Sequence, residues 1–132
     1  MANNLQNFDV SRILCIDEQC LVVNKLCGEA VEGAVSGMAD LPLILGQYLN
    51  SSENNFPKPF SGSSILSAPV AVQRLDVPVT GCALFARTQE ALVFLNRVFN
   101  SSEHGNGAAE KYYWAIIEKP GRDIKASANL VH

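Results

Sequence analysis

Two apolar runs around a short polar centre dominate the hydrophobic pattern, and both lie between residues 70 and 87. The first run, residues 70–75, contains β-branched residues and predicts a buried strand, and residues 81–86 predict a second strand. Pro78 cannot join a ladder of hydrogen bonds, and Thr80 with the glycine that follows it supplies the residues of a turn. The pattern therefore predicts a strand, a reversal and a second strand.

The polar centre of this stretch holds Arg74 and Asp76, which are two residues apart. In an extended chain, residues at that spacing point to the same side, so we expect the guanidinium to lie beside the carboxylate and to favour its ionised form. Asp76 also falls where a core strand ends, which is a rigid place to present a carboxylate. Two interpretations stay open: a structural ion pair, or a carboxylate placed for chemistry.

Two amphipathic helices are predicted on either side of this stretch. The first covers Leu41–Leu49, where Asp40 is a suitable N-cap and Pro42 falls in the first turn. The second covers residues 89–99, with Thr88 as the N-cap and an apolar stripe expected to pack in the core. Both patterns repeat at the helical spacing of three or four residues.

The remaining pattern completes the prediction of the fold. Short apolar runs at Ile13–Ile16 and residues 20–24, joined by polar residues, predict a hairpin. Residues 50–67 are rich in Ser, Asn, Pro and Gly and predict a long surface loop, whereas the alternation over residues 111–117 predicts a strand. We therefore expect an α+β fold, with a mixed, mostly antiparallel sheet and two helices packed against it.

Composition narrows the class of protein. The 132 residues correspond to a single domain over positions 1–132, and 48% hydrophobic residues suffice for a core. A net charge of −3 argues against bulk electrostatic capture of nucleic acid, so any RNA contact must be local. Neither a signal peptide nor a membrane-spanning segment is visible, so we expect a cytoplasmic protein without membrane contact.

The number and spacing of the cysteines and histidines argue against a metal site. Four cysteines lack the C-x-x-C spacing of zinc sites, and the chain has only two histidines. We expect reduced thiols that pack in or near the core, without a metal ion or a cofactor. The four thiols are those of Cys15, Cys20, Cys27 and Cys82.

The central stretch resembles a motif of the RluA-type pseudouridine synthases, H-R-L-D-x-x-T-S-G-L-L-L-F-A-K. The Arg, Leu, Asp and Gly of the motif are present here, and the stretch ends in L-F-A-R. Gln73 stands in place of the usual His, Val79 in place of the usual Thr, and Thr80 in place of the usual Ser. The aspartate of this motif is the catalytic residue of the family, so the resemblance implies that role for Asp76.

Two further segments resemble motifs of the same family in the same order. The segment I-L-C-I-D-E-Q-C-L-V-V-N-K is similar to the strand pair that precedes V-V-N-K-P, with Leu26 in place of the proline. Lys25 is either the matching lysine or simply a solvated strand end. The segment K-Y-Y-W-A resembles K-x-Y-x-A, which implies that Tyr113 lies against the target base and that Lys111 is the motif lysine. For Tyr113, a core aromatic with a satisfied hydroxyl is the alternative.

The resemblance implies an RNA pseudouridine synthase that isomerises uridine in rRNA or tRNA, with RNA as the partner and no cofactor or metal. Asp76 would attack either the base or the sugar carbon, and Tyr113 would stack on the base or help to move its proton. Arg74 would hold the carboxylate or fill the gap left by a flipped nucleotide. Lys111 and Thr80 are further candidates for RNA contact.

The end of the chain departs from the family pattern, because nothing after residue 118 resembles the later motif that contributes an arginine. We therefore expect a C-terminally truncated catalytic domain that is inactive alone and self-associates through an exposed sheet edge. Two alternative functions stay open: an inactive RNA-binding remnant of the fold, and, ranked far lower, a glycosidase, which needs two facing carboxylates.

Overall fold

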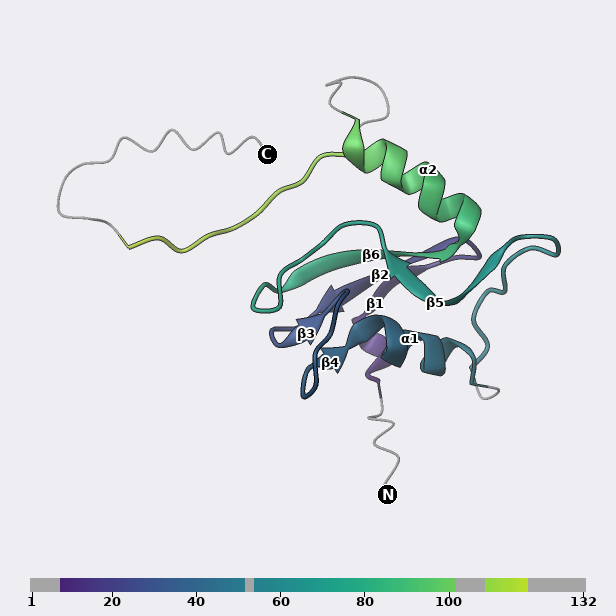
Figure 1. The fold of residues 1–132 in the computed structure, drawn as a ribbon, viewed down its shortest axis with the longest axis horizontal. Coiled ribbons are helices and arrows are strands. Elements are labelled where there is room, and N and C mark those ends of the chain that lie inside the picture. The colour runs from purple at the N-terminus through teal and green to yellow at the C-terminus, as the bar shows by residue number, and fades with distance from the viewer. Residues whose placement is uncertain (1–7, 52–53, 102–108, 119–132) are drawn as a thin grey trace.

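The fold is an antiparallel sheet with helices packed against it, as the computed structural model of residues 8–51, 54–101 and 109–118 shows (Figure 1). The sheet has the strand order β1-β2-β6-β5, and a separate pair of short parallel strands, β3 and β4, lies beside it. The α+β class with a mixed, mostly antiparallel arrangement is therefore confirmed. The elements are η1 (Val10–Arg12), β1 (Ile13–Ile16), β2 (Cys20–Lys25), β3 (Glu29–Ala30), β4 (Ala39–Asp40), α1 (Leu41–Leu49), β5 (Ile65–Ala71), β6 (Gly81–Thr88) and α2 (Gln89–Asn100).

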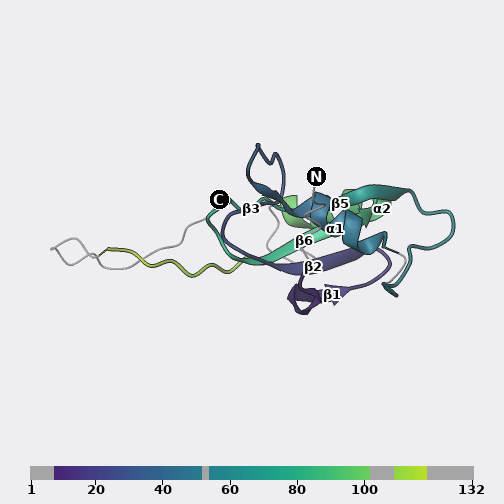
Figure 2. The same cartoon turned by 90° about the horizontal axis from the view of Figure 1, so that it is seen from below.

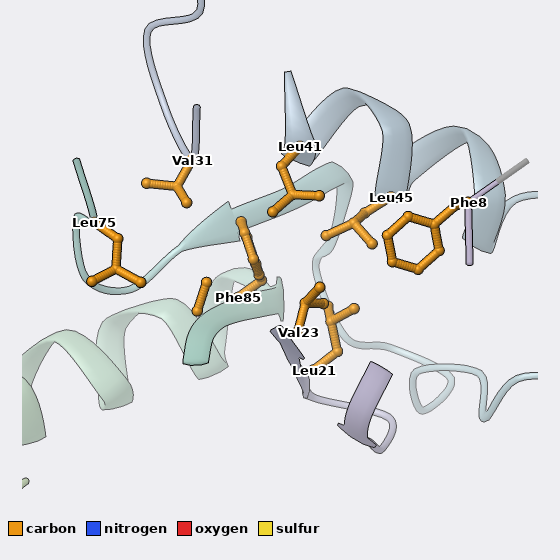
Figure 3. Packing of buried hydrophobic residues seen from close by; sticks show 9 residues of the cluster. Phe8, Leu21, Val23, Val31, Leu41, Leu45, Leu75 and Phe85 are labelled. Carbon is orange, nitrogen blue, oxygen red and sulfur yellow. The ribbon is translucent and has the colours of Figure 1, made fainter. Parts of the chain in front are cut away.

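The core lies between α1 and one face of the sheet (Figure 3). Leu21 of β2 stands opposite Phe85 of β6, and both side chains are completely buried. Leu41 and Leu45 project from α1 onto this pair, and they are also completely buried. The sheet, seen edge-on in Figure 2, curves under this layer. Each such aliphatic or aromatic side chain contributes about 1.5–3 kcal/mol by leaving water, so this face carries most of the fold's stability.

Helix α1 begins where its capping residue predicts. The side chain of Asp40 accepts a hydrogen bond from the backbone N–H of Leu43 at 3.0 Å, and Pro42 occupies the first turn. The helix packs closely on β5, because a methyl group added at Gly46 would lie 3.1 Å from the Cβ of Ala68. Only a glycine allows the helix to approach the strand this closely without displacing its neighbours.

Helix α2 also begins at its predicted cap. The hydroxyl of Thr88 accepts from the N–H of Ala91 at 3.2 Å and donates to the side-chain oxygen of Gln19 at 2.7 Å. The helix lies over Cys20 and Ala86, on the face of the sheet opposite to Leu21 and Phe85. The expected apolar stripe is only partly in a core: Ala91 is buried, whereas Leu92, Leu95, Val98 and Phe99 are half-buried.

The strand predicted over residues 70–75 was misplaced, because β5 begins at Ile65 and ends at Ala71. The predicted loop over residues 50–67 is correspondingly shorter. Pro69 is tolerated within the strand because β5 is the edge of the sheet. Beyond Val72, whose N–H still binds the carbonyl of Leu84, the side chain of Gln73 rather than the backbone contacts β6.

The strand predicted over residues 111–117 was wrong. Residues 109–118 form no regular element and run as an extended trace away from α2 (Figure 1). Trp114 and Ile116 are fully exposed, and Tyr113 is 62% exposed. A strand is stabilised by its cross-strand neighbours, and no strand among the described residues pairs with this segment.

Among the described residues, no helix has both the length and the apolar character that crossing a membrane requires.

The prediction of core thiols was also wrong for three of the four cysteines. Cys15, Cys27 and Cys82 are exposed, and Cys20 is half-buried. Cys15 and Cys82 alternate out of the core because their cross-strand partners, Val22 and Asn24, lie on the face opposite to α1. Burial, with the nearby Asp17 carboxylate as a further cause, raises the pKa of Cys20 to about 11.

We expect the Cys20 thiol to be poorly reactive in the folded chain at pH 8. Raising its pKa from 9.0 to about 11 lowers the thiolate fraction about a hundredfold, and the thiolate is the nucleophile. Alkylation with iodoacetamide, read residue by residue by mass spectrometry, measures the rate, and the same cysteine in urea-unfolded chain is the control. Equal rates in the two states would contradict this prediction.

Candidate active site

A tight turn presents the carboxylate of Asp76 to solvent. The backbone N–H of Val79 donates to the carbonyl of Asp76 at 2.9 Å and closes the turn. Leu75, immediately before it, is 7% exposed and belongs to the core cluster, whereas the Asp76 side chain is 71% exposed. The turn is therefore anchored from below by an apolar side chain while its carboxylate points outward.

Lys25, at the end of β2, holds this turn from inside the protein. Its side chain is completely buried, so the interpretation as a solvated strand end was wrong. The ammonium donates to the carbonyls of Val79 at 2.5 Å, Val77 at 3.0 Å and Leu26 at 3.1 Å. An ammonium has three donors, and here each of them has a backbone acceptor. Burying this charge is tolerable because every donor is satisfied.

The contacts continue from the turn into the N-terminal part of the chain. The carbonyl of Val77 also accepts from the N–H of Gly28 at 2.9 Å. One oxygen of Glu29 accepts from the N–H of Leu26 at 2.8 Å and from Arg12 at 2.6 Å. The Arg12 and Glu29 side chains are only 14% and 11% exposed, so this ion pair is shielded from water. The backbone of the Asp76 turn is thus tied to η1 through a chain of polar contacts.

Arg74 lies between two carboxylates on the surface of the turn. Its Nε is 3.5 Å from Oδ1 of Asp76, as the spacing of the two residues predicted. Its Nη1 is 3.5 Å from Oε1 of Glu32, a residue that the sequence analysis missed because it lies in a distant loop outside any motif. All three side chains are more than half exposed, and such surface pairs contribute about 0–1 kcal/mol each. The guanidinium is therefore held only weakly.

Gln73, next to this cluster, has one satisfied and one unsatisfied end. Its side-chain amide donates to the carbonyl of Cys82 at 3.3 Å. Its Oε1 is buried and lacks a hydrogen-bond partner among the described residues. Buried acceptors without a donor are rare, so this oxygen is an available acceptor directly beside the candidate site.

The structure brings together some of the predicted site residues and not others. Arg74, Asp76 and Thr80 belong to one turn region, and Thr80 is exposed. Lys111 lies instead over the ring of Phe99, with its Nζ 5.5 Å from the ring centre. No hydrogen bond or ion pair among the described residues joins Tyr113 to Asp76, so their proximity stays a prediction.

A metal centre has no counterpart in this geometry. Across residues 8–51, 54–101 and 109–118, no three His, Cys, Asp or Glu side chains gather closely enough to hold a metal ion. The groups in this region are an exposed carboxylate, a guanidinium in two weak ion pairs and a buried amide oxygen. Such a set can act as a nucleophile or as an electrostatic stabiliser toward a planar polar substrate.

The comparison with known proteins agrees with this chemistry. Residues 19–131 match the RNA pseudouridylate synthases, and the chain belongs to that family. It is similar to an uncharacterized RNA pseudouridine synthase of Zymomonas mobilis, with 31% identity over 107 residues. The match covers 81% of this chain and 41% of the relative, so the chain spans about two fifths of that protein's length.

Replacing Lys25 by methionine should destabilise the fold strongly. Methionine fills a similar volume but removes the ammonium from three backbone carbonyls. Those of Val77 and Leu26 keep the N–H groups of Gly28 and Glu29, whereas that of Val79 loses its donor, and the expected loss is about 2–4 kcal/mol of unfolding free energy. Urea-induced unfolding followed by circular dichroism measures it. Lys111→Met removes a charge from an exposed position and serves as the matched control. If the two variants lose the same small amount, the Lys25 contacts do not hold the turn.

Proposed function

We propose that this chain carries the catalytic carboxylate of an RluA-type pseudouridine synthase acting on uridine in rRNA or tRNA, and that the carboxylate is Asp76. The observation that carries the proposal is an exposed carboxylate on a turn whose backbone is fixed by Leu75 and Lys25. A group that attacks a substrate must be accessible and must also be held in one place. The family membership supports the reaction type.

The reaction is an isomerisation in which the base is detached and reattached. The bond between the base nitrogen and the sugar carbon breaks, and a bond from a base carbon to that sugar carbon forms. The base carbon loses its proton and the freed nitrogen gains one, so that substrate and product have the same atoms. Asp76 acts as the ionised carboxylate that attacks either the sugar or the base carbon. The reaction changes no oxidation state, which fits a site built from a carboxylate, a guanidinium and hydrogen-bonding groups.

Arg74 acts on the RNA rather than only on Asp76. A uridine within a helix must leave the base stack before a carboxylate can reach it. A planar guanidinium matches the shape of the vacated space and interacts with the phosphates beside it. The weak 3.5 Å contacts of Arg74 to Asp76 and Glu32 support this role, because they are easily exchanged for contacts to RNA.

Tyr113, Lys111 and Thr80 complete the proposed RNA-binding surface. The exposure of Tyr113 supports a role in contacting the substrate, because its ring is available for stacking on a base. This proposal requires residues 109–118 to move toward the Asp76 turn when RNA binds. A catalytically inactive RNA-binding protein is the alternative, and the outward position of Tyr113 together with Gln73 favours it.

A glycosidase is the less favoured of the alternatives. Such enzymes place two carboxylates on opposite sides of the bond that they cleave, with space for the substrate between them. Glu32 and Asp76 are two carboxylates in one cluster, but both contact the guanidinium of Arg74. That guanidinium occupies the space that a sugar would need.

Asp76→Asn should abolish turnover in an active form of the enzyme that contains this chain. The amide keeps the shape but cannot attack as a carboxylate, so we expect a loss of about a thousandfold or more in rate. RNA affinity should change less than about threefold, because one exposed contact is worth little. Release of tritium from uridine labelled at the base carbon measures turnover, and Glu18→Gln at the other end of the sheet is the control. Appreciable residual activity would overturn the role of Asp76.

We further propose that this chain self-associates through residues 112–117. The segment exposes Trp114, Ile116 and Ile117, and its extended form suits it to pair with a sheet edge. The edge strands of the described sheet are β1 and β5. Residues 112–117 of one copy can therefore pair with either edge strand of a second copy.

Light scattering over a concentration series should therefore show a mass that rises with concentration. Ile116→Lys should shift the association midpoint to about tenfold higher concentration, because it puts a charge into the apolar contact. Val93→Lys, at another exposed apolar position on α2, is the control and should leave the midpoint unchanged. A chain that stays monomeric at all concentrations would contradict the proposal.

A further inference from the structure

A second polar site lies at the end of the sheet opposite to the Asp76 turn. A hollow of about 420 Å³ opens between the C-terminal end of α1, residues 54–59 and β5, and Arg87 near the end of β6 lines it. We propose that this hollow binds an anion of the phosphate class. This inference rests on the proposed function in one point, which is the source of the phosphate.

Arg87 is a buried cation, and some of its N–H donors have no partner among the described residues. Its side chain is on the same face of β6 as Phe85, and the residue is only 9% exposed. One terminal nitrogen donates to the backbone carbonyl of Asp17, and no carboxylate of the described residues lies within 4.0 Å of the guanidinium. Burial lowers the pKa of Arg87, and the carboxylates of Asp17 and Glu18, which lie farther away than an ion pair, oppose this effect only in part.

Two nitrogens of the Arg87 side chain, Nε and Nη2, have no hydrogen-bond partner among the described residues. Neither is among the buried polar atoms without a partner, so both keep some contact with solvent, and the residue lines the hollow. A guanidinium carries five N–H donors, and the carbonyl of Asp17 occupies only one nitrogen. The others are available to a ligand that enters the hollow.

The other lining residues favour an anion over a cation. Lys58 lines the hollow, is exposed and forms no ion pair with a described residue. None of the described lining residues is acidic, although the chain as a whole carries a net charge of −3. Asn50 and Asn54 add amide groups that can donate to an oxygen. Among the described lining residues, the charged side chains are therefore the two cations Arg87 and Lys58.

Phosphate fits this set better than a carboxylate alone. An arginine fork binds two phosphate oxygens at once, and a lysine adds a point charge to the third. Phe56, Ile65 and Leu66 supply apolar walls, and a hollow of about 420 Å³ falls in the usual range for nucleotide-sized ligands. The phosphate belongs either to a free nucleotide or to the backbone of RNA that extends from the Asp76 turn. Six residues of extended chain separate Gly81 from Arg87, which is roughly 20 Å.

Titration of the 132-residue chain with inorganic phosphate, followed by amide chemical shifts at constant ionic strength, tests the proposal. Among the described residues, we expect saturable shifts confined to 46–51, 54–59, 65–69 and 87. Lys58→Gln should weaken binding about fivefold, because it removes one charge-assisted contact from an exposed position and leaves the fold intact. Arg97→Gln, an exposed cation on α2, is the matched control and should bind phosphate as the unaltered chain does.

Uridine monophosphate and a short single-stranded RNA distinguish the two sources. An RNA that shifts the same amides and displaces inorganic phosphate identifies the backbone as the source, whereas saturation by the nucleotide alone identifies a free ligand. Asp76→Asn should leave phosphate binding unchanged, so a failure of the catalytic proposal is distinguishable from a failure of this one. Shifts that do not saturate, or equal effects of Lys58→Gln and Arg97→Gln, would overturn the anion site.

Discussion

One buried ammonium fixes the position of the candidate active site. Lys25 ends β2 in the middle of the sheet, and its ammonium donates to the carbonyls of Val77 and Val79 in the Asp76 turn and to that of Leu26. A lysine this deeply buried is tolerated only because every donor is used, so the turn and the lysine depend on each other. Leu75 anchors the same turn in the core. The position of the Asp76 carboxylate therefore depends on both the sheet and the core.

The site combines a fixed backbone with loosely held side chains. On the inner side, Lys25 and Gly28 donate hydrogen bonds to the carbonyls of the turn. On the surface, the guanidinium of Arg74 lies 3.5 Å from the carboxylate of Glu32 and 3.5 Å from that of Asp76. Preorganised backbone places the carboxylate without a cost at the moment of reaction. Weak side-chain pairs, in contrast, leave the guanidinium able to exchange its partners. The proposed reaction, in which a nucleotide leaves the stack before the carboxylate reaches it, needs both properties at adjacent positions.

The sequence predicts local features of this fold well and long-range ones poorly. Asp40 and Thr88 were recognisable as caps because capping is decided within four residues. The burial of Lys25 was not recognisable, since its acceptors at Val77 and Val79 lie more than fifty positions away. The start of β5 at Ile65 was hidden by Ser and Pro, which an edge strand tolerates. In the candidate site, the Arg74–Asp76 contact followed from spacing, whereas Glu32 and the unsatisfied Gln73 oxygen arise only from the folded arrangement.

At each end of the central strands β2 and β6, a buried cation donates to a backbone carbonyl of a turn, but the two cations differ in their number of N–H donors. At one end Lys25 donates to the carbonyls of a turn, and at the other Arg87 donates to the carbonyl of Asp17 in the β1–β2 turn. Lys25 has three donors, and all of them bind backbone carbonyls within the protein, so its role is to hold the structure. Arg87 has five, one of its nitrogens donates to the carbonyl of Asp17, and the residue also lines an open hollow. The difference in donor number separates a cation that holds the fold from one that can also hold a ligand.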